Sequence, residues 1–350
     1  MLDLTEALNR ILNWLQRQKR EYPQATEEWW FRLLEEENNA PFVKPGLSSA
    51  EIEEITRNIQ QEFPPEVYQL YQWRNGSFYN DSCFDWLFDI GKGWGFFMGL
   101  GFHPLQTLVQ KNSRHTKTSG LNLFIGSDCK DGYLIYDKYS QSFPIICIGN
   151  KGGAGQTISK YASLTDMMLT IADCYEQAYY INANGYFSKD ENKALEIWQK
   201  YNSHHIVSAT LSKIAQLEPQ LLKINTDKGF RLLEETANTW KWTGDFRFAE
   251  ILMRVLQKPP TNTNNDEQSD YFRSQASKFL WSSSDSRVVK PLIKILEEEY
   301  WLTRYYATIA LGYLGDDSAI PALNEMLQDN NEMVREAAQN TLSQIEKRSN

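Results

Sequence analysis

A 31-residue repeat in the C-terminal part most constrains what this chain can fold into. Eight positions recur at this one offset, and they include both apolar and charged residues. The matched pairs are Asp285/Asp316, Val289/Ile320, Leu292/Leu323, Leu296/Leu327, Arg304/Arg335, Ala307/Ala338, Leu311/Leu342 and Leu314/Ile345. One period earlier, Arg273, Ala276 and Leu280 fit the same pattern. Because the apolar positions follow helical spacing, the repeat predicts a solenoid of helical hairpins that bury their faces on one another.

The first half of the chain has a different pattern, which predicts an α+β domain. Residues 4–15 place leucine and isoleucine at helical spacing, which indicates an amphipathic N-terminal helix. Ser48 and Glu51 form a capping-box pattern that opens a second helix. A third helix is expected to end at Asn75-Gly76, because this pair is a typical C-terminal cap.

Short apolar segments follow and predict the sheet. Aromatic and glycine-rich strands are expected at 83–90 and 94–102, and an antiparallel meander at 121–126, 133–136 and 143–148. Ser163 and Asp166 then open a closing helix. The expected fold is therefore an antiparallel or mixed sheet flanked by helices.

From Ser188 onward the pattern is helical and predicts no strand. Ser188 and Glu191 form another capping-box pattern, and residues 259–269 are expected to be an exposed loop. We therefore expect three parts: an α+β domain over 1–185, a helical connector over 186–265, and helical repeats over 266–350.

Charge and cysteine usage limit the partners and the compartment. The net charge is −9 and the isoelectric point is about 5.2, which argues against nucleic-acid binding because that needs a basic surface. Residues 1–66 carry 7 basic and 13 acidic side chains, so this region would suit a basic protein partner. No segment is apolar and long enough to span a membrane, and we expect a cytoplasmic protein. The four cysteines are expected to be buried thiols, with one long-range disulfide as the alternative.

The residue patterns indicate no catalytic, metal or cofactor site. The adjacent His204 and His205 would diverge on a helix and could not share a zinc ion. The glycine-rich segment 149–155 lacks the Gly-Lys-Ser/Thr ending of a phosphate-binding loop. We therefore expect no enzyme activity and no cofactor.

Aromatic residues are the candidates for partner binding, because Trp and Tyr dominate binding hot spots. The glycine-aromatic segment at 91–102 and its flank is either core or a partner-facing patch. The candidate binding residues are Trp86, Trp94, Phe96, Phe97, Tyr305 and Tyr306.

Two resemblances refine these expectations. The segment PGLSSAEIEEITRNIQQEFPPEVYQLYQWRNGS resembles the opening of SUKH domains, the SMI/KNR type of fungal cell-wall synthesis regulators and bacterial toxin-immunity proteins. LNLFIGSDCKDGYLIYD and FPIICIGN resemble the central strands of that family. This resemblance covers about residues 1–185 and implies protein binding, including a toxin-immunity role or the regulation of cell-envelope synthesis.

The C-terminal repeats resemble HEAT-like repeats of the phycobilisome-lyase subtype. The residues that carry this resemblance include Asp285, Arg304, Ala307, Asp316, Arg335 and Ala338. The resemblance implies that Arg304 and Arg335 tie adjacent repeats together, and that Asp285 and Asp316 are structural. It also implies protein binding, with a chromophore lyase or phycobilisome-type assembly factor as the alternative. The leading hypothesis is thus a non-catalytic protein-binding adaptor or regulator.

Overall fold

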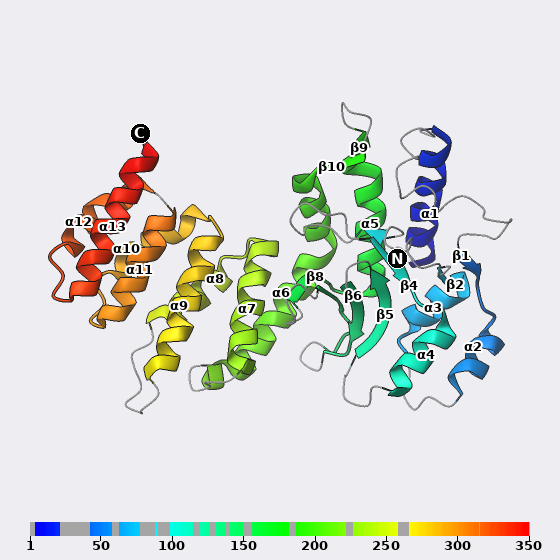
Figure 1. The fold of residues 1–350 in the computed structure, drawn as a ribbon. Helices are drawn as coiled ribbons and strands as arrows, with labels where there is room; N and C mark the ends of the chain where they lie inside the picture. Colours follow the sequence, from blue (N-terminus) through cyan, green and yellow to red (C-terminus); the bar gives the residue numbers. More distant parts are fainter. Residues whose placement is uncertain are drawn as a thin grey trace. The chain divides into compact units, whose positions relative to one another are not determined.

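The computed structural model describes residues 4–21, 43–57, 63–77, 88–89, 99–114, 120–126, 130–137, 141–149, 156–181, 187–221, 227–257, 266–314 and 316–349. The chain divides into two compact units, Met1–Ile206 and Val207–Asn350, whose elements are labelled in Figure 1. The division falls inside one long helix, α6 (Glu191–Leu221). The expected boundaries at residues 185 and 265 stay a prediction.

The first unit combines helices with antiparallel strands. Its helices before α6 are α1 (Leu4–Glu21), α2 (Ser49–Thr56), α3 (Pro65–Trp73), α4 (Leu105–Arg114) and α5 (Leu164–Gln177). Two small strand pairs accompany them: β1 (Val43–Pro45) with β2 (Arg74–Ser77), and β9 (Tyr179–Ile181) with β10 (Phe187–Lys189). Leu8 and Ile11 of α1 are buried together with Met167 and Ile171 of α5, and these two helices pack on each other.

The main sheet is an antiparallel meander, as expected for its central strands. Among the described residues it has six strands that are neighbours in chain order. The strands are β3 (Phe88–Asp89), β4 (Gly99–Phe102), β5 (Gly120–Gly126), β6 (Lys130–Ile135), β7 (Ile145–Gly149) and β8 (Gln156–Tyr161). Leu123, Phe124, Leu134 and Ile145 are buried and supply the core of this sheet.

Two predicted helix ends differ in the structure. Helix α3 ends at Trp73, and Asn75-Gly76 lies in β2 instead of capping the helix. Gly76 adopts φ +83 beside Pro104, where an added Cβ would lie 2.6 Å from the Pro104 backbone nitrogen. A close chain approach, and not helix termination, therefore explains this glycine.

Helix α6 begins at Glu191, and its N-cap is not the residue that the sequence predicted. Ser188 lies in β10, and the Asp190 carboxylate accepts the backbone N–H groups of Asn192 and Lys193 at 3.0 Å each. Asp190 therefore caps α6, and the chain forms a short strand where continuous helix was expected. The capping predictions at Ser48 and Ser163 are confirmed.

The first half of α6 belongs to the packing of the first unit. The Trp198 indole N–H donates to the Lys160 carbonyl at 3.1 Å, beside the edge strand β8. The Asn202 side chain accepts the Ala162 N–H at 3.0 Å and donates to the Thr170 hydroxyl at 3.0 Å. Because these groups are buried, their hydrogen bonds fix α6 against β8 and α5.

The second unit is built of stacked helices. After α6 come α7 (Asp227–Thr243), α8 (Arg247–Gln257), α9 (Asp266–Ser282), α10 (Val289–Ile295), α11 (Trp301–Leu314), α12 (Ile320–Met326) and α13 (Glu332–Ser349), with short 3₁₀ turns η3 (Ser286–Val288) and η4 (Asp317–Ala319). Helix α9 begins inside the segment that was expected to be a loop. Helix α11 packs against both α9 and α13.

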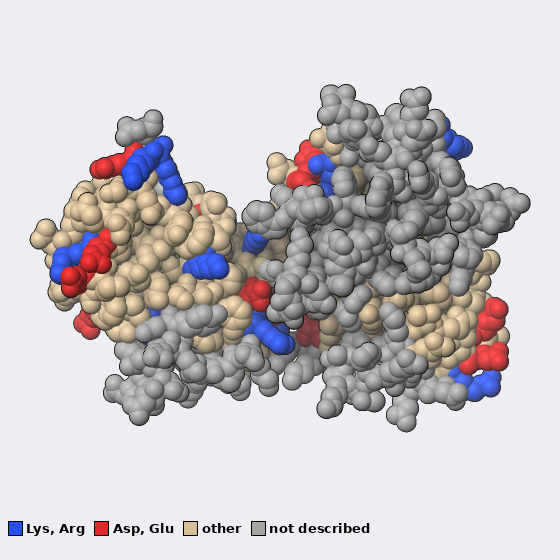
Figure 2. All heavy atoms as spheres, viewed as in Figure 1, with Lys and Arg blue, Asp and Glu red and all other residues tan. Residues whose placement is uncertain are grey.

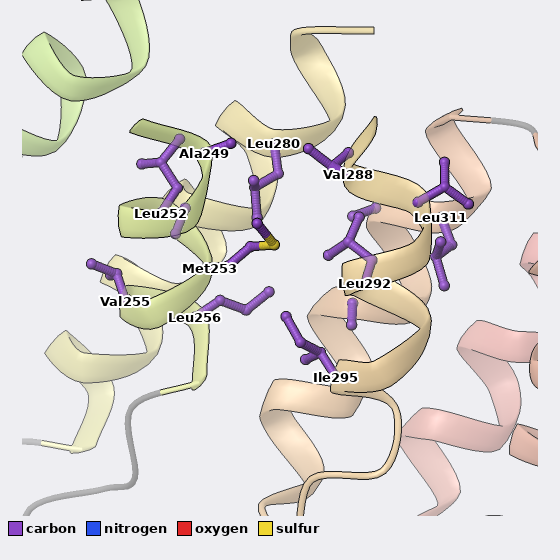
Figure 3. Packing of buried hydrophobic residues seen from close by; sticks show 14 of the residues in the cluster. Ala249, Leu252, Met253, Val255, Leu256, Leu280, Val288, Leu292, Ile295 and Leu311 are labelled. Atoms are coloured by element: carbon purple, nitrogen blue, oxygen red, sulfur yellow. The ribbon is translucent and has the colours of Figure 1, made fainter. Parts of the chain in front are cut away.

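One apolar core runs through these helices. Figure 3 shows side chains from α8, such as Leu252 and Leu256, meeting Leu280 of α9 and Leu292 and Ile295 of α10. The matched alanines Ala276, Ala307 and Ala338 are all fully buried in the second unit. Small residues at these positions let neighbouring helices approach closely.

Candidate protein-binding surface

Asp285 and Asp316 lie at the turns between helices of the repeats. The Asp285 carboxylate accepts the Arg287 N–H at 2.9 Å, and the Asp316 carboxylate accepts the Ser318 N–H at 2.8 Å. Asp245, at the turn between α7 and α8, makes the same contact with the Arg247 N–H at 3.1 Å. The hydrogen bonds that form at each turn hold the pKa of all three carboxyl groups below the usual value. The repeated turn therefore also occurs upstream of the sequence repeat.

Arg304 joins successive parts of the repeat region. Its guanidinium bonds the Asp329 carboxylate in a fork, with Nε–Oδ2 at 2.6 Å and Nη2–Oδ1 at 2.8 Å. It also donates to the Glu298 and Glu299 carbonyls at 2.7 and 2.8 Å. Burial acts to raise the pKa of Asp329, but hydrogen bonds from Arg304 and from the Asn331 N–H outweigh it, so this pKa lies below its usual value.

The remaining candidate residues of the repeats, Arg335, Tyr305 and Tyr306, differ in their contacts. Arg335 donates from Nη1 to the Asp329 carbonyl at 2.7 Å. Tyr305 and Tyr306 are half-buried on α11, and their rings meet edge to face with centroids 5.2 Å apart. Tyr306 packs against the apolar core, whereas Tyr305 lies in an outward-facing row of the same helix. Trp86, Trp94, Phe96 and Phe97 lie outside the described residues.

The outward row of α11 was only partly identified from the sequence. Tyr305, Ile309 and Tyr313 follow at four-residue spacing, so they share one side of the helix. Tyr313 is 49% exposed, and its ring stacks on Trp281 of α9 with centroids 4.1 Å apart. The four-residue spacing is the sequence signal that could have identified Ile309 and Tyr313 as surface residues.

The 31-residue offset places equivalent residues on α9 and α13. We call the set of nine positions the central face: Ser274, Lys278 and Ser282 of α9, Tyr305, Ile309 and Tyr313 of α11, and Glu336, Asn340 and Gln344 of α13. All nine are half-buried or exposed. An apolar middle row thus lies between two polar rows, and in Figure 2 the surface over α11 is uncharged.

A second polar cluster lies in the first unit and was not predicted. Asp173 of α5 is almost fully buried, and its carboxylate accepts from Arg10 at 2.6 Å, Lys200 at 2.8 Å and the Tyr201 hydroxyl at 2.6 Å. Burial acts to raise the pKa of Asp173, but these hydrogen bonds lower it below the usual value. The cluster ties α1 and α6 to α5, and its charges satisfy one another.

The cysteine and histidine residues discussed above can be placed where they fall within the described ranges. Cys147 and Cys174 are buried free thiols. His204 and His205 are exposed, with ring centroids 5.5 Å apart and nearly perpendicular planes. Over the described ranges, the structure holds no group of three or more His, Cys, Asp or Glu residues suited to a metal ion. None of the described helices is both long and apolar enough to cross a membrane.

The fold of the second unit is that of a helical-repeat protein. Comparison with protein families matches residues 266–349 to the family described as HEAT repeats. The expectation of HEAT-like repeats at the C-terminal end is thus confirmed, and such repeats suggest a role in protein interaction. A comparison with curated proteins finds no match. The resemblance of the N-terminal part to SUKH domains gains no support from these comparisons and stays a prediction.

Proposed function

We propose that this chain is a non-catalytic adaptor or regulator that binds a protein partner through the central face of its HEAT-like repeats. The observation that carries the proposal is the outward row of Tyr305, Ile309 and Tyr313 in the middle of that face. Repeat proteins use such stacked helices as extended binding surfaces. Exposed aromatic side chains on a rigid frame are suited to anchor a partner, because they bury a large area with little loss of side-chain freedom.

Site-specific photo-crosslinking tests this proposal. A photoreactive phenylalanine derivative replaces Tyr313 in the full chain, and a second protein carries it at Tyr136. Tyr136 is a matched control because it is 47% exposed, against 49% for Tyr313, and lies in the first unit. We expect one defined protein adduct from native lysate at position 313, weakened by Tyr305→Ala, and no such adduct at 136. Equal labelling at both positions, or no adduct at 313, would refute the proposal.

A toxin-immunity role is a more specific form of protein binding, and it would use a surface of the first unit and not the central face. It is supported by α2, on which Glu51, Glu53 and Glu54 are all exposed. A basic toxin would meet favourable charge there, and its affinity would fall as salt rises. Binding of a basic partner that does not change between low and high salt would contradict this form. Nothing among the described residues favours the chromophore-lyase alternative.

A further inference from the structure

The central face has a geometry that selects among classes of binding partner. Its middle row offers Tyr305, Ile309 and Tyr313 at successive turns of α11, and the rows on α9 and α13 offer polar side chains at the same levels. Helices α9 and α13 both pack directly on α11. The backbone groups of α11 are already bonded within the helix, so the middle row presents side chains and no free backbone donors or acceptors.

This arrangement favours a helical partner over an extended one. An extended segment over the middle row would turn its own backbone N–H and C=O groups sideways, toward the rows on α9 and α13, which offer about one polar side chain per helical turn. That spacing is too wide to pair every backbone group, and groups that are buried without a partner cost free energy. A helix satisfies its backbone internally and presents apolar side chains at three- and four-residue spacing, which matches the spacing of Tyr305, Ile309 and Tyr313.

The charges on either side of the middle row specify the partner further. Among the nine positions of the central face, the charged residues are Lys278 on α9 and Glu336 on α13, and both are exposed. Within α11 the charged residue is Arg304, which is buried against Asp329 and does not face a partner. Arg348, near the end of α13, is also exposed, and its guanidinium donates to the Gly312 and Tyr313 carbonyls at 3.1 Å each. A helix seated on the middle row therefore meets Lys278 on one flank and Glu336 on the other, with this second cation beside the end of the row.

We propose that the central face binds an amphipathic α-helix of a protein partner, acidic along one flank and basic along the other. The apolar side of that helix covers Tyr305, Ile309 and Tyr313, its acidic flank faces Lys278, and its basic flank faces Glu336. This inference rests on the proposed function, and it names the kind of segment that the same surface takes.

Synthetic peptides test the inference with the full chain. Three 18-residue helical peptides share one leucine face and carry acidic and basic flanks (mixed), two acidic flanks, or two basic flanks. A fourth peptide has the mixed sequence with a central proline, which prevents a continuous helix. Fluorescence anisotropy measures binding, and circular dichroism measures helix formation on binding. We expect the mixed peptide to bind best, by about two- to fivefold, since exposed ion pairs are weak.

Charge-reversal variants of the protein should then change which of the three helical peptides binds best. Lys278→Glu makes both flanks acidic and should favour the basic peptide, whereas Glu336→Lys should favour the acidic one. Two control variants, Lys290→Glu on α10 and Glu325→Lys on α12, make the same charge reversals at exposed positions outside the central face. They should leave the order of the peptide affinities unchanged. Tyr313→Ala should weaken all helical peptides by at least about tenfold.

Several results would overturn the inference. These are failure of all three helical peptides to bind, equal binding of the proline peptide, or the same change of order in the control variants as in the central-face variants. The photo-crosslink at Tyr313 reports separately on the proposed function. An adduct at Tyr313 without the peptide preferences would leave protein binding in place and exclude the charged amphipathic helix.

Discussion

Replacing Arg304 by methionine removes the charge that holds Asp329 while keeping an apolar stem of similar length. The side chains of the pair are 9% and 4% exposed, respectively, so water cannot replace the lost partner. Breaking one side of a buried ion pair costs about 3–5 kcal/mol, because the remaining charge stays buried and unpaired. A loss of about 3 kcal/mol in a unit of this size lowers the unfolding temperature by about 6–12 °C.

The assay must report on the second unit alone, since the chain has two compact units. Hydrogen exchange followed by mass spectrometry on peptides from α11 and α13 gives that resolution, and thermal unfolding by circular dichroism gives the temperature. We expect faster exchange in both helices of Arg304→Met. The double variant with Asp329→Asn should recover part of the loss, because it removes the buried charge.

Arg247 supplies the control for this prediction. It forms a similar fork with Asp245, but its side chain is 59% exposed. Arg247→Met should therefore change stability little. If Arg304→Met matched Arg247→Met, or if Asp329→Asn gave no recovery, the argument that Arg304 pairs a buried charge across the repeats would be refuted.

Three further predictions concern other parts of the chain. A chain ending at residue 185 lacks the hydrogen bonds of Trp198 and Asn202. Its free energy of unfolding in urea should therefore be at least about 2 kcal/mol lower than that of a chain ending at residue 221. Equal urea midpoints for the two chains would contradict this. Gly312→Ala places a Cβ 2.9 Å from Thr341 Oγ1 and should lower the free energy of unfolding by about 1–3 kcal/mol. Adding Thr341→Ala should restore this stability. A loss that persists in the double variant would exclude this contact as the cause. Because the folded pKa of Asp173 is lowered, its stabilisation is present above about pH 4 and lost as the pH falls through the folded value. The unfolding temperature of wild type should thus fall more steeply from pH 5 to pH 3 than that of Asp173→Asn, and parallel curves would disprove the assignment.

Local signals in the sequence were sufficient for several elements. Ser48 and Ser163 begin helices as predicted, because a hydroxyl two or three residues ahead of a free N–H caps it regardless of the surroundings. The central strands β5, β6 and β7 of the meander were also predictable, since turns and apolar runs alternate along one segment. The HEAT-like repeats were predictable because each helix contacts helices one or two places away along the chain, so the repeat pattern stays local.

Long-range contacts determined the features that the local sequence did not predict. Asn75-Gly76 reads locally as a helix cap, yet it lies in β2, which pairs with β1, and Gly76 lies close to Pro104, 28 residues later in the chain. Asp173 gives no local signal, because its partners Arg10 and Lys200 come from distant parts of the chain.

The central face shows both contributions. The sequence by itself determined that the positions of Lys278, Ile309 and Asn340 are equivalent, because they share one offset. Only the tertiary structure decided that these positions face outward, since exposure depends on which sides of α11 are covered by α9, α10 and α13. Periodicity fixes which residues share a face of a helix, and packing fixes which face remains accessible to a partner.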